Sequence, residues 1–332
     1  MFVGHGVLAF VIVAWLARTL DRPVREAAAL GLVAAAFGTL PDVDMVYAPL
    51  GLLSGVGSLA GASAAFWETA GAVHRTATHS LVVGALATLA VGAWLARPAR
   101  WRSPLIPSGR GSVQRPTGAW VRPSPLLSLA AVGVGVSLVL VGVAGGGAVG
   151  GAVVGLFVVG ALGIATLARR ADLPGGWTVL AAGVGLLTHP FGDLLTGTPP
   201  RLLYPLDAVL LEGRIVLAPD PTVNLLLAFF VELAVIWLGL ATVARLQGWR
   251  LGWRVHPRAA LGVGYAAVLV AVPAPSLDTA APFVVSVLAV GGVGAPLAVS
   301  DGDGGWWDAF VTATSAVTVA GLAYLLAYLV VG

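Results

Sequence analysis

About ten apolar stretches follow one another along this chain, each long enough or nearly long enough to cross a bilayer. A helix needs about 20 apolar residues to cross about 30 Å of hydrocarbon. Apolar residues make up 58% of the 332 residues and charged residues only 10%, which a water-soluble domain could not bury. We therefore predict an all-α fold, a polytopic transmembrane helix bundle of about ten helices, within a range of eight to twelve. The stretches are 2–17, 27–40, 79–96, 125–144, 147–168, 177–197, 222–244, 259–273, 281–299 and 309–331.

The segment 97–124 interrupts this pattern. It is rich in Pro, Arg, Ser and Gly and has no apolar period, which is typical of a flexible loop. We expect it to be cytoplasmic and to separate an N-terminal membrane unit, 1–96, from a C-terminal membrane unit, 125–332. The first stretch has no preceding basic region and no small-residue cleavage site, so we expect a retained helix rather than a cleaved signal.

The arginines predict the orientation of the chain. With the N-terminus outside the cytoplasm, all but three of the 18 basic residues fall in cytoplasmic loops, as the positive-inside rule expects. The exceptions are Arg75, Arg201 and Arg214. The sequence has no basic stripe interleaved with aromatic residues, so we expect no nucleic-acid partner.

Four short motifs place histidines and carboxylates in this apolar chain. Such groups are costly in a membrane and are ligands of zinc and related divalent cations. The chain has no cysteine, which excludes thiolate zinc sites and iron–sulfur clusters. In the predicted orientation all the motifs lie on the extracytoplasmic face. The seven candidate ligands exceed the four that one zinc takes, so we expect one to three ions, two preferred. They are His5, Asp42, Asp44, His74, His79, His189 and Asp193.

The Pro-Asp-Val-Asp motif follows the second stretch. Pro41 disfavours helix at Leu40, so we expect the helix to end there and the motif to form a turn or an extended segment. In an extended segment Asp42 and Asp44 would project to one side and address one centre. The alternative is a turn in which both carboxylates bind local backbone amides.

The spacing of the other two paired motifs can be compared with that of a helix. His189 and Asp193, four residues apart, share one face of a helix, either as metal ligands or as a buried hydrogen-bonded pair. His74 and His79, five residues apart, cannot share a helical face, so we expect Thr78 to cap the helix and His79 to lie in its first turn.

Four further residues have weaker signals. His5 stands between two glycines, which would allow another element to approach closely. Glu232 lies in the middle of a membrane helix and must be paired or protonated. Glu68 is a further candidate ligand or base, although no spacing supports it, and we expect His256 to be solvated.

The arginines outside the cytoplasm suit an anionic substrate, because a guanidinium group binds phosphate or carboxylate through two hydrogen bonds. Arg75 lies inside a histidine motif, and Arg201 and Arg214 flank the loop after the sixth long stretch. Contact with lipid headgroups is the alternative for Arg214. The candidate catalytic residues are therefore Asp42, Asp44, Arg75 and Arg201.

Taken together, the motifs resemble the YdjM-type family of membrane-bound metal-dependent hydrolases. The resemblance rests on His5, Leu40 to Asp44, His74-Arg75, Thr78-His79-Ser80, His189 to Thr196 and Leu203-Tyr-Pro205. The regions 97–176 and beyond about residue 220 carry no recognised signature. The His and Asp set is also loosely similar to the zinc motifs of phospholipase C and P1-type nucleases. The resemblance implies a metal-dependent hydrolase and leaves its substrate open.

Our leading hypothesis is a hydrolase whose divalent metal, most simply zinc, activates water against a phosphoester of a membrane lipid. Ester or amide lipids are alternative substrates. A transporter or metal-handling protein is the main rival, although it would place its ligands near mid-membrane, often in repeated halves. A further alternative is a scaffold whose metal only joins helices.

Overall fold

The computed structural model describes residues 3–54, 57–71, 73–96, 124–249, 255–295 and 305–331. Every regular element in these residues is helical, so the predicted all-α bundle is confirmed. The predicted loop 97–124 lies outside the described residues except for Ser124. The long helices are α1 (Gly4–Thr19), α2 (Val24–Thr39), α4 (Leu81–Leu95), α5 (Pro125–Arg170), α6 (Gly175–Asp193), α7 (Pro221–Gln247) and α11 (Gly305–Val331).

The element α5 is a hairpin of two helices. Its backbone leaves helical geometry at Gly146 and Gly147, and Gly147 has a φ of 58°, which glycine adopts without strain. On either side of this turn the halves pack closely, since a Cβ on Gly142 would lie 2.7 Å from the carbonyl oxygen of Gly150. The predicted stretches 125–144 and 147–168 are these two halves.

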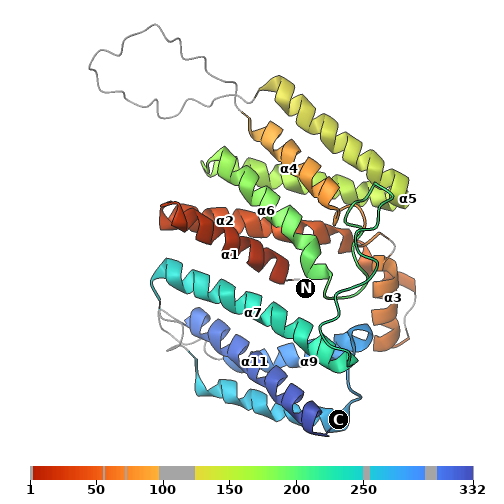
Figure 1. Cartoon of the computed structure of the whole chain (residues 1–332), viewed down its shortest axis with the longest axis vertical. Helices are drawn as coiled ribbons and strands as arrows, with labels where there is room; N and C mark the ends of the chain where they lie inside the picture. The colour runs from red at the N-terminus through yellow and green to blue at the C-terminus, as the bar shows by residue number, and fades with distance from the viewer. Residues whose placement is uncertain are drawn as a thin grey trace.

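Close glycine contacts bring α1, α2 and α6 together. A Cβ on Gly185 of α6 would lie 2.6 Å from the backbone nitrogen of Gly38 in α2. A Cβ on Gly38 would in turn lie 2.9 Å from the carbonyl oxygen of His5 in α1. Small residues let membrane helices approach to backbone contact. As a result, the first turn of α1, the end of α2 and the last turns of α6 meet at one end of the bundle (Figure 1).

A second group of helices packs beside α1. Its core includes Leu226 of α7, Phe283 of α9 (Ala280–Val290) and Tyr324 of α11. The predicted stretch 259–273 is mostly a 3-10 helix, η3 (Pro257–Ala267), followed by α8 (Val268–Ala271). The predicted stretch 281–299 is α9 followed by η5 (Gly291–Gly294), and the short η4 (Leu277–Thr279) precedes α9.

The segment between α2 and α4 contains elements that the sequence analysis did not predict. The chain continues from α2 into η1 (Leu40–Met45), then η2 (Ala48–Ser54) and α3 (Leu59–Gly71). Figure 1 shows α3 lying crosswise to α2 at the end of the bundle that holds the N-terminus. Within the described residues, five helical segments are long and apolar enough to cross a membrane, one of them the run Val24–Leu53 from α2 into η2. The helices α1 and α4 and the run Pro257–Ala271 are shorter and apolar.

Candidate metal centre

All seven candidate ligands lie in one cluster, contributed by four parts of the chain. The first turn of α1 supplies His5, η1 supplies Asp42 and Asp44, and the turn before α4 supplies His74 and His79. The last turn of α6 supplies His189 and Asp193. Three overlapping groups have ligand atoms within 4.8 Å of one another: His5 with Asp42 and His189, Asp44 with His74 and His79, and His79 with His189 and Asp193.

Four side chains form the centre of this cluster. The Nε2 atom of His79 lies 3.0 Å from Nε2 of His189 and 3.1 Å from Oδ2 of Asp193. Asp42 Oδ1 lies 3.6 Å from the first of these nitrogens and 3.5 Å from the second. Ligands about 2.0–2.1 Å from a tetrahedral zinc ion are about 3.3 Å from one another. With the 3.7 Å between His189 Nε2 and Asp193 Oδ2, five separations among these four donor atoms lie near this value.

The second nitrogen of each central histidine is bound elsewhere. His189 Nδ1 lies 2.7 Å from the carbonyl oxygen of Gly38, which can only accept a hydrogen bond, so Nδ1 carries the hydrogen. His79 Nδ1 lies 3.2 Å from Asp44 Oδ2 and 3.0 Å from the hydroxyl of Thr78. With Nδ1 donating in both rings, each Nε2 presents a lone pair to the centre. This is the arrangement that metal-binding histidines adopt.

Asp193 provides the clearest test of whether the residues fit a metal. Its Oδ1 accepts a hydrogen bond from Arg75 at 3.1 Å and lies 3.3 Å from His5 Nε2. Its Oδ2, on the side of His79, is buried and has no hydrogen-bond partner. Its nearest polar neighbours are the Nε2 atoms of His79 at 3.1 Å and His189 at 3.7 Å, so a proton on His79 or a cation among the donors would satisfy it.

Asp44 differs from Asp42 in its environment. Its carboxylate is fully buried and contacts His74 Nδ1 at 2.8 Å, the hydroxyl of Thr78 at 2.9 Å and the backbone N–H of Arg75 at 3.2 Å. These donors and His79 occupy most of its lone pairs. Asp44 therefore suits a role in orienting the histidine turn.

The expectation that Asp42 and Asp44 project to one side is wrong. The motif forms a 3-10 helix, in which residues two apart differ by about 240° around the axis. The two carboxylates consequently lie on opposite sides of His79, with Asp42 near its Nε2 and Asp44 near its Nδ1.

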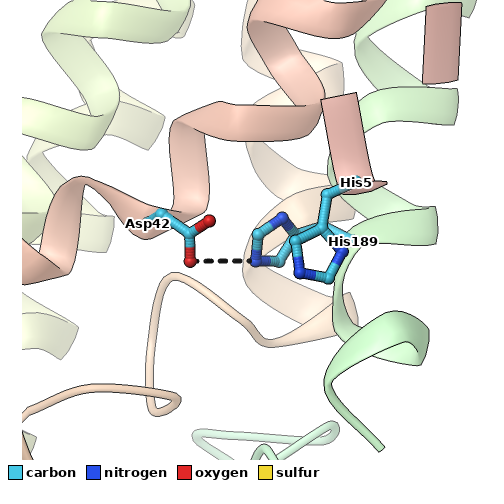
Figure 2. Close-up of side chains that lie close together, drawn as sticks. All are labelled: His5, Asp42 and His189. Carbon is cyan, nitrogen blue, oxygen red and sulfur yellow. Dashed lines mark ion pairs between the residues drawn. The ribbon is translucent and has the colours of Figure 1, made fainter. Parts of the chain in front are cut away.

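His5 completes the cluster from α1. Figure 2 shows its ring against that of His189, and Asp42 lies on the side of the His189 ring away from His5. The ring centroids of the two histidines lie 3.9 Å apart. Glu232 of α7 accepts a hydrogen bond from the backbone N–H of Gly4 at 3.3 Å. Glu232 is thus paired, as expected, and its partner is the first turn of α1, which carries His5.

Arg75 joins the cluster to the loop after α6. Its guanidinium donates to Asp193, to the carbonyl oxygens of Thr196 and Thr198, and to the hydroxyl of Thr196. Its backbone has a φ of 62°, which positions it between Asp44 and Asp193. Most of its donors are therefore engaged within the protein.

The other two arginines lie further from the centre. The backbone N–H of Arg201 donates to the carbonyl oxygen of Arg75 at 3.0 Å, and its exposed guanidinium stacks 6.0 Å from the ring of Tyr204. Arg214 pairs with Asp278 at 3.7 Å. Arg201 thus lies at the rim of the cluster, whereas Arg214 connects the loop to η4.

Several sequence expectations about neighbouring residues need correction. Ser80, not Thr78, caps α4, because its hydroxyl accepts from the backbone N–H groups of Val82 and Val83. His79 consequently precedes the helix instead of lying in its first turn. Glu68, a further candidate ligand, lies on α3 outside the cluster. His256 is exposed, as expected, and its side chain caps η3.

The charge of the cluster favours a cation. Complete burial opposes a charged His79, but the carboxylates of Asp193, Asp42 and Asp44 outweigh it and raise the pKa of this imidazole well above its usual value. Only two of the seven side chains are appreciably exposed, Asp42 at 18% and His74 at 15%. Solvent or a substrate would therefore approach the centre past these two residues.

These features define a helical membrane protein with a buried cluster of histidines and carboxylates at one end of its bundle. The profile of the YdjM inner membrane protein family matches residues 1–275, so the chain belongs to this family. The match extends through α7 and η3, beyond the segments on which the resemblance rested. No curated protein and no solved structure matches the chain.

Proposed function

We propose that this protein is a membrane-embedded metal-dependent hydrolase, and that its substrate is a phosphoester of a lipid or lipid-linked molecule. The observation that carries the proposal is the close approach of two imidazole Nε2 atoms and the carboxylates of Asp42 and Asp193, with Asp193 Oδ2 buried 3.1 Å from His79 Nε2. This donor set suits zinc.

His79, His189 and Asp193 would hold the first ion, a set of three ligands that leaves a coordination position for water. A second ion would share His79 or bind through Asp44 and His74. A bound divalent cation supplies Lewis acidity and lowers the pKa of a coordinated water.

The remaining chemistry belongs to the side chains. Asp42 is the more exposed of the two η1 carboxylates and would accept a proton from the attacking water. Arg75 orients Asp193 through its Oδ1. The guanidinium of Arg201, at the rim, would bind the anionic group of the substrate.

The transporter hypothesis fits the structure less well. All the candidate ligands lie at one end of their helices, and the helices beneath them pack tightly. Ala9, Val13, Ala34 and Ala181 are among the fully buried residues of this packed region. In the described part of the chain, this core separates the cluster from the opposite end of the bundle.

We also propose an orientation for the chain in the membrane. In the described residues, Arg22 of the α1–α2 turn lies 5.5 Å from the ring of Trp177 near the start of α6, at the end opposite the cluster. Arg169 and Arg170 end α5 at the same level. The positive-inside rule then puts the cluster on the extracytoplasmic face.

The decisive experiment incubates purified protein with a total membrane lipid extract and follows all cleaved products by mass spectrometry. We expect headgroup or phosphate release that a chelator stops and that Asp193→Ala abolishes, while the surface variant His256→Ala retains activity. Release of fatty acid without phosphate would move the assignment to an ester or amide hydrolase. Without any metal-dependent product the hydrolase proposal would fail.

A further inference from the structure

The arm formed by η2 and α3 begins and ends at the metal centre. It follows η1, which carries Asp44, and it precedes His74. The hydroxyl of Tyr47 ties its two ends together, donating to the carbonyl oxygen of Ala70 at 2.6 Å and accepting from the N–H of Val73 at 3.1 Å. The arm therefore leaves the cluster and returns to it on the same side of the membrane.

The arm is too short to cross a bilayer. With 13 residues, α3 is about 20 Å long, and the seven residues of η2 span about 14 Å. Both fall short of about 30 Å of hydrocarbon. The crosswise position of α3 in Figure 1 agrees with a helix that lies in the plane of the membrane.

The surface of the arm is apolar. Leu50, Leu52, Leu53 and Trp67 are exposed at 61%, 43%, 81% and 44%. Glu68, next to Trp67, is the single charged residue in the described part of the arm. Tryptophan beside a charged residue is typical of the membrane interface. Such a cluster of large apolar side chains is unfavourable in water.

Two observations favour the bilayer as the partner of this surface. A Cβ on Gly146, in the turn of α5, would lie 2.7 Å from Val73, which follows α3. The arm is thus level with the end of a membrane hairpin whose Leu140 and Val143 are exposed at 63% and 45%. In addition, an open hollow of about 400 Å³ between η2 and α3, lined by Leu50, Gly51, Ala65, Glu68 and Thr69, has room for hydrocarbon.

We propose that η2 and α3 form an in-plane arm whose apolar side chains insert among the acyl chains of the leaflet on the side of the metal centre. Insertion of about 5–10 Å is usual for such elements. Lipid would then reach the cluster laterally along the arm. This route for a substrate rests on the hydrolase function proposed above, whereas the insertion does not.

Fluorescence quenching by brominated lipids tests the insertion. The chain has no cysteine, so Leu53→Cys can carry a single environment-sensitive fluorophore in phosphatidylcholine vesicles brominated near the glycerol end of the acyl chains. Leu140→Cys, on a membrane helix and similarly exposed, is the positive control. Ala171→Cys, exposed at the turn after α5, is the aqueous control.

We expect quenching at Leu53→Cys to approach that at Leu140→Cys and to exceed that at Ala171→Cys several-fold. Quenching no greater than at Ala171→Cys would overturn the proposal, whether the arm stands in water or is covered by a second copy of the chain. Because the measurement does not use activity, it succeeds or fails independently of the hydrolase assignment.

Discussion

His79 and His189 face each other through their Nε2 atoms at 3.0 Å, while each Nδ1 is engaged with an acceptor elsewhere. Two unprotonated nitrogens at this distance would direct their lone pairs at each other. The pair is stable only with a proton or a cation between the rings. This requirement links the geometry of the cluster to metal binding, and most of our predictions follow from it.

The first prediction concerns the central donors. Replacing both His79 and Asp193 by alanine removes two of the three donors in the group that they form with His189, so purified protein should lose most of its bound transition metal. Elemental analysis against the wild type is the measurement. His256→Ala, at an exposed histidine outside the cluster, is the matched control and should retain the metal. Equal metal content in all three proteins would contradict our assignment.

The second prediction compares the loss of metal affinity caused by replacing Asp44 with that caused by replacing Asp193. Asp44 contacts both His74 and His79 and orients the turn that carries them. Loss of such an orienting carboxylate typically weakens metal affinity about 10–100-fold. Asp44→Asn should therefore bind metal that many times more weakly, whereas Asp193→Asn should lose binding further. Competition with a chelator of known affinity gives both constants, and the reverse order would make Asp44 a direct ligand.

The pH dependence of metal binding gives a third prediction. Because the surrounding carboxylates raise the pKa of His79, an incoming metal competes with protons for this imidazole more strongly than it would at an ordinary histidine. Affinity should therefore fall as the pH falls, by about tenfold per unit when one proton is released. Titrations between about pH 6 and pH 8 measure the slope. A constant affinity across this range would show that His79 binds metal without losing a proton.

The sequence was sufficient to predict the bundle and the membership of the cluster. Apolar stretches identify membrane helices because the bilayer requires a minimum length, and the two halves of α5 could be separated at the glycines between them. His5 could be included because Gly6 allows close approach: a Cβ there would lie 2.7 Å from Thr39.

The finer geometry depended on contacts that no local pattern specifies. The spacing of Asp42 and Asp44 fits both an extended segment and a 3-10 helix, and only packing selects the latter. Thr78 and Ser80 are both good capping residues, so the assignment of the cap depends on Asp44, which binds the hydroxyl of Thr78. The α3 helix was missed because it is too short to be read as a membrane span.

The orientation prediction uses two exposed positions at opposite ends of the bundle. Gly213, in the loop after α6, has open space around it, and Ala171 is exposed at the turn after α5. In intact cells, an impermeant thiol reagent should label Gly213→Cys and should label Ala171→Cys only after the membrane is opened. The opposite pattern would place the metal centre on the cytoplasmic face.

The last prediction tests whether the contact between α2 and α6 builds the centre. A side chain at Gly185 would meet the backbone of Gly38 and Ala34, which cannot yield as a flexible side chain would. Gly185→Val should therefore lower the unfolding temperature in detergent, with a cost of about 1–3 kcal/mol, and it should weaken metal binding because α6 carries His189 and Asp193. Gly176→Ala, near the start of the same helix and with nothing within 4 Å of its Cβ, is the matched control and should bind metal as the wild type does. If Gly185→Val bound metal normally despite its lower stability, the donors would be held in place without this glycine contact.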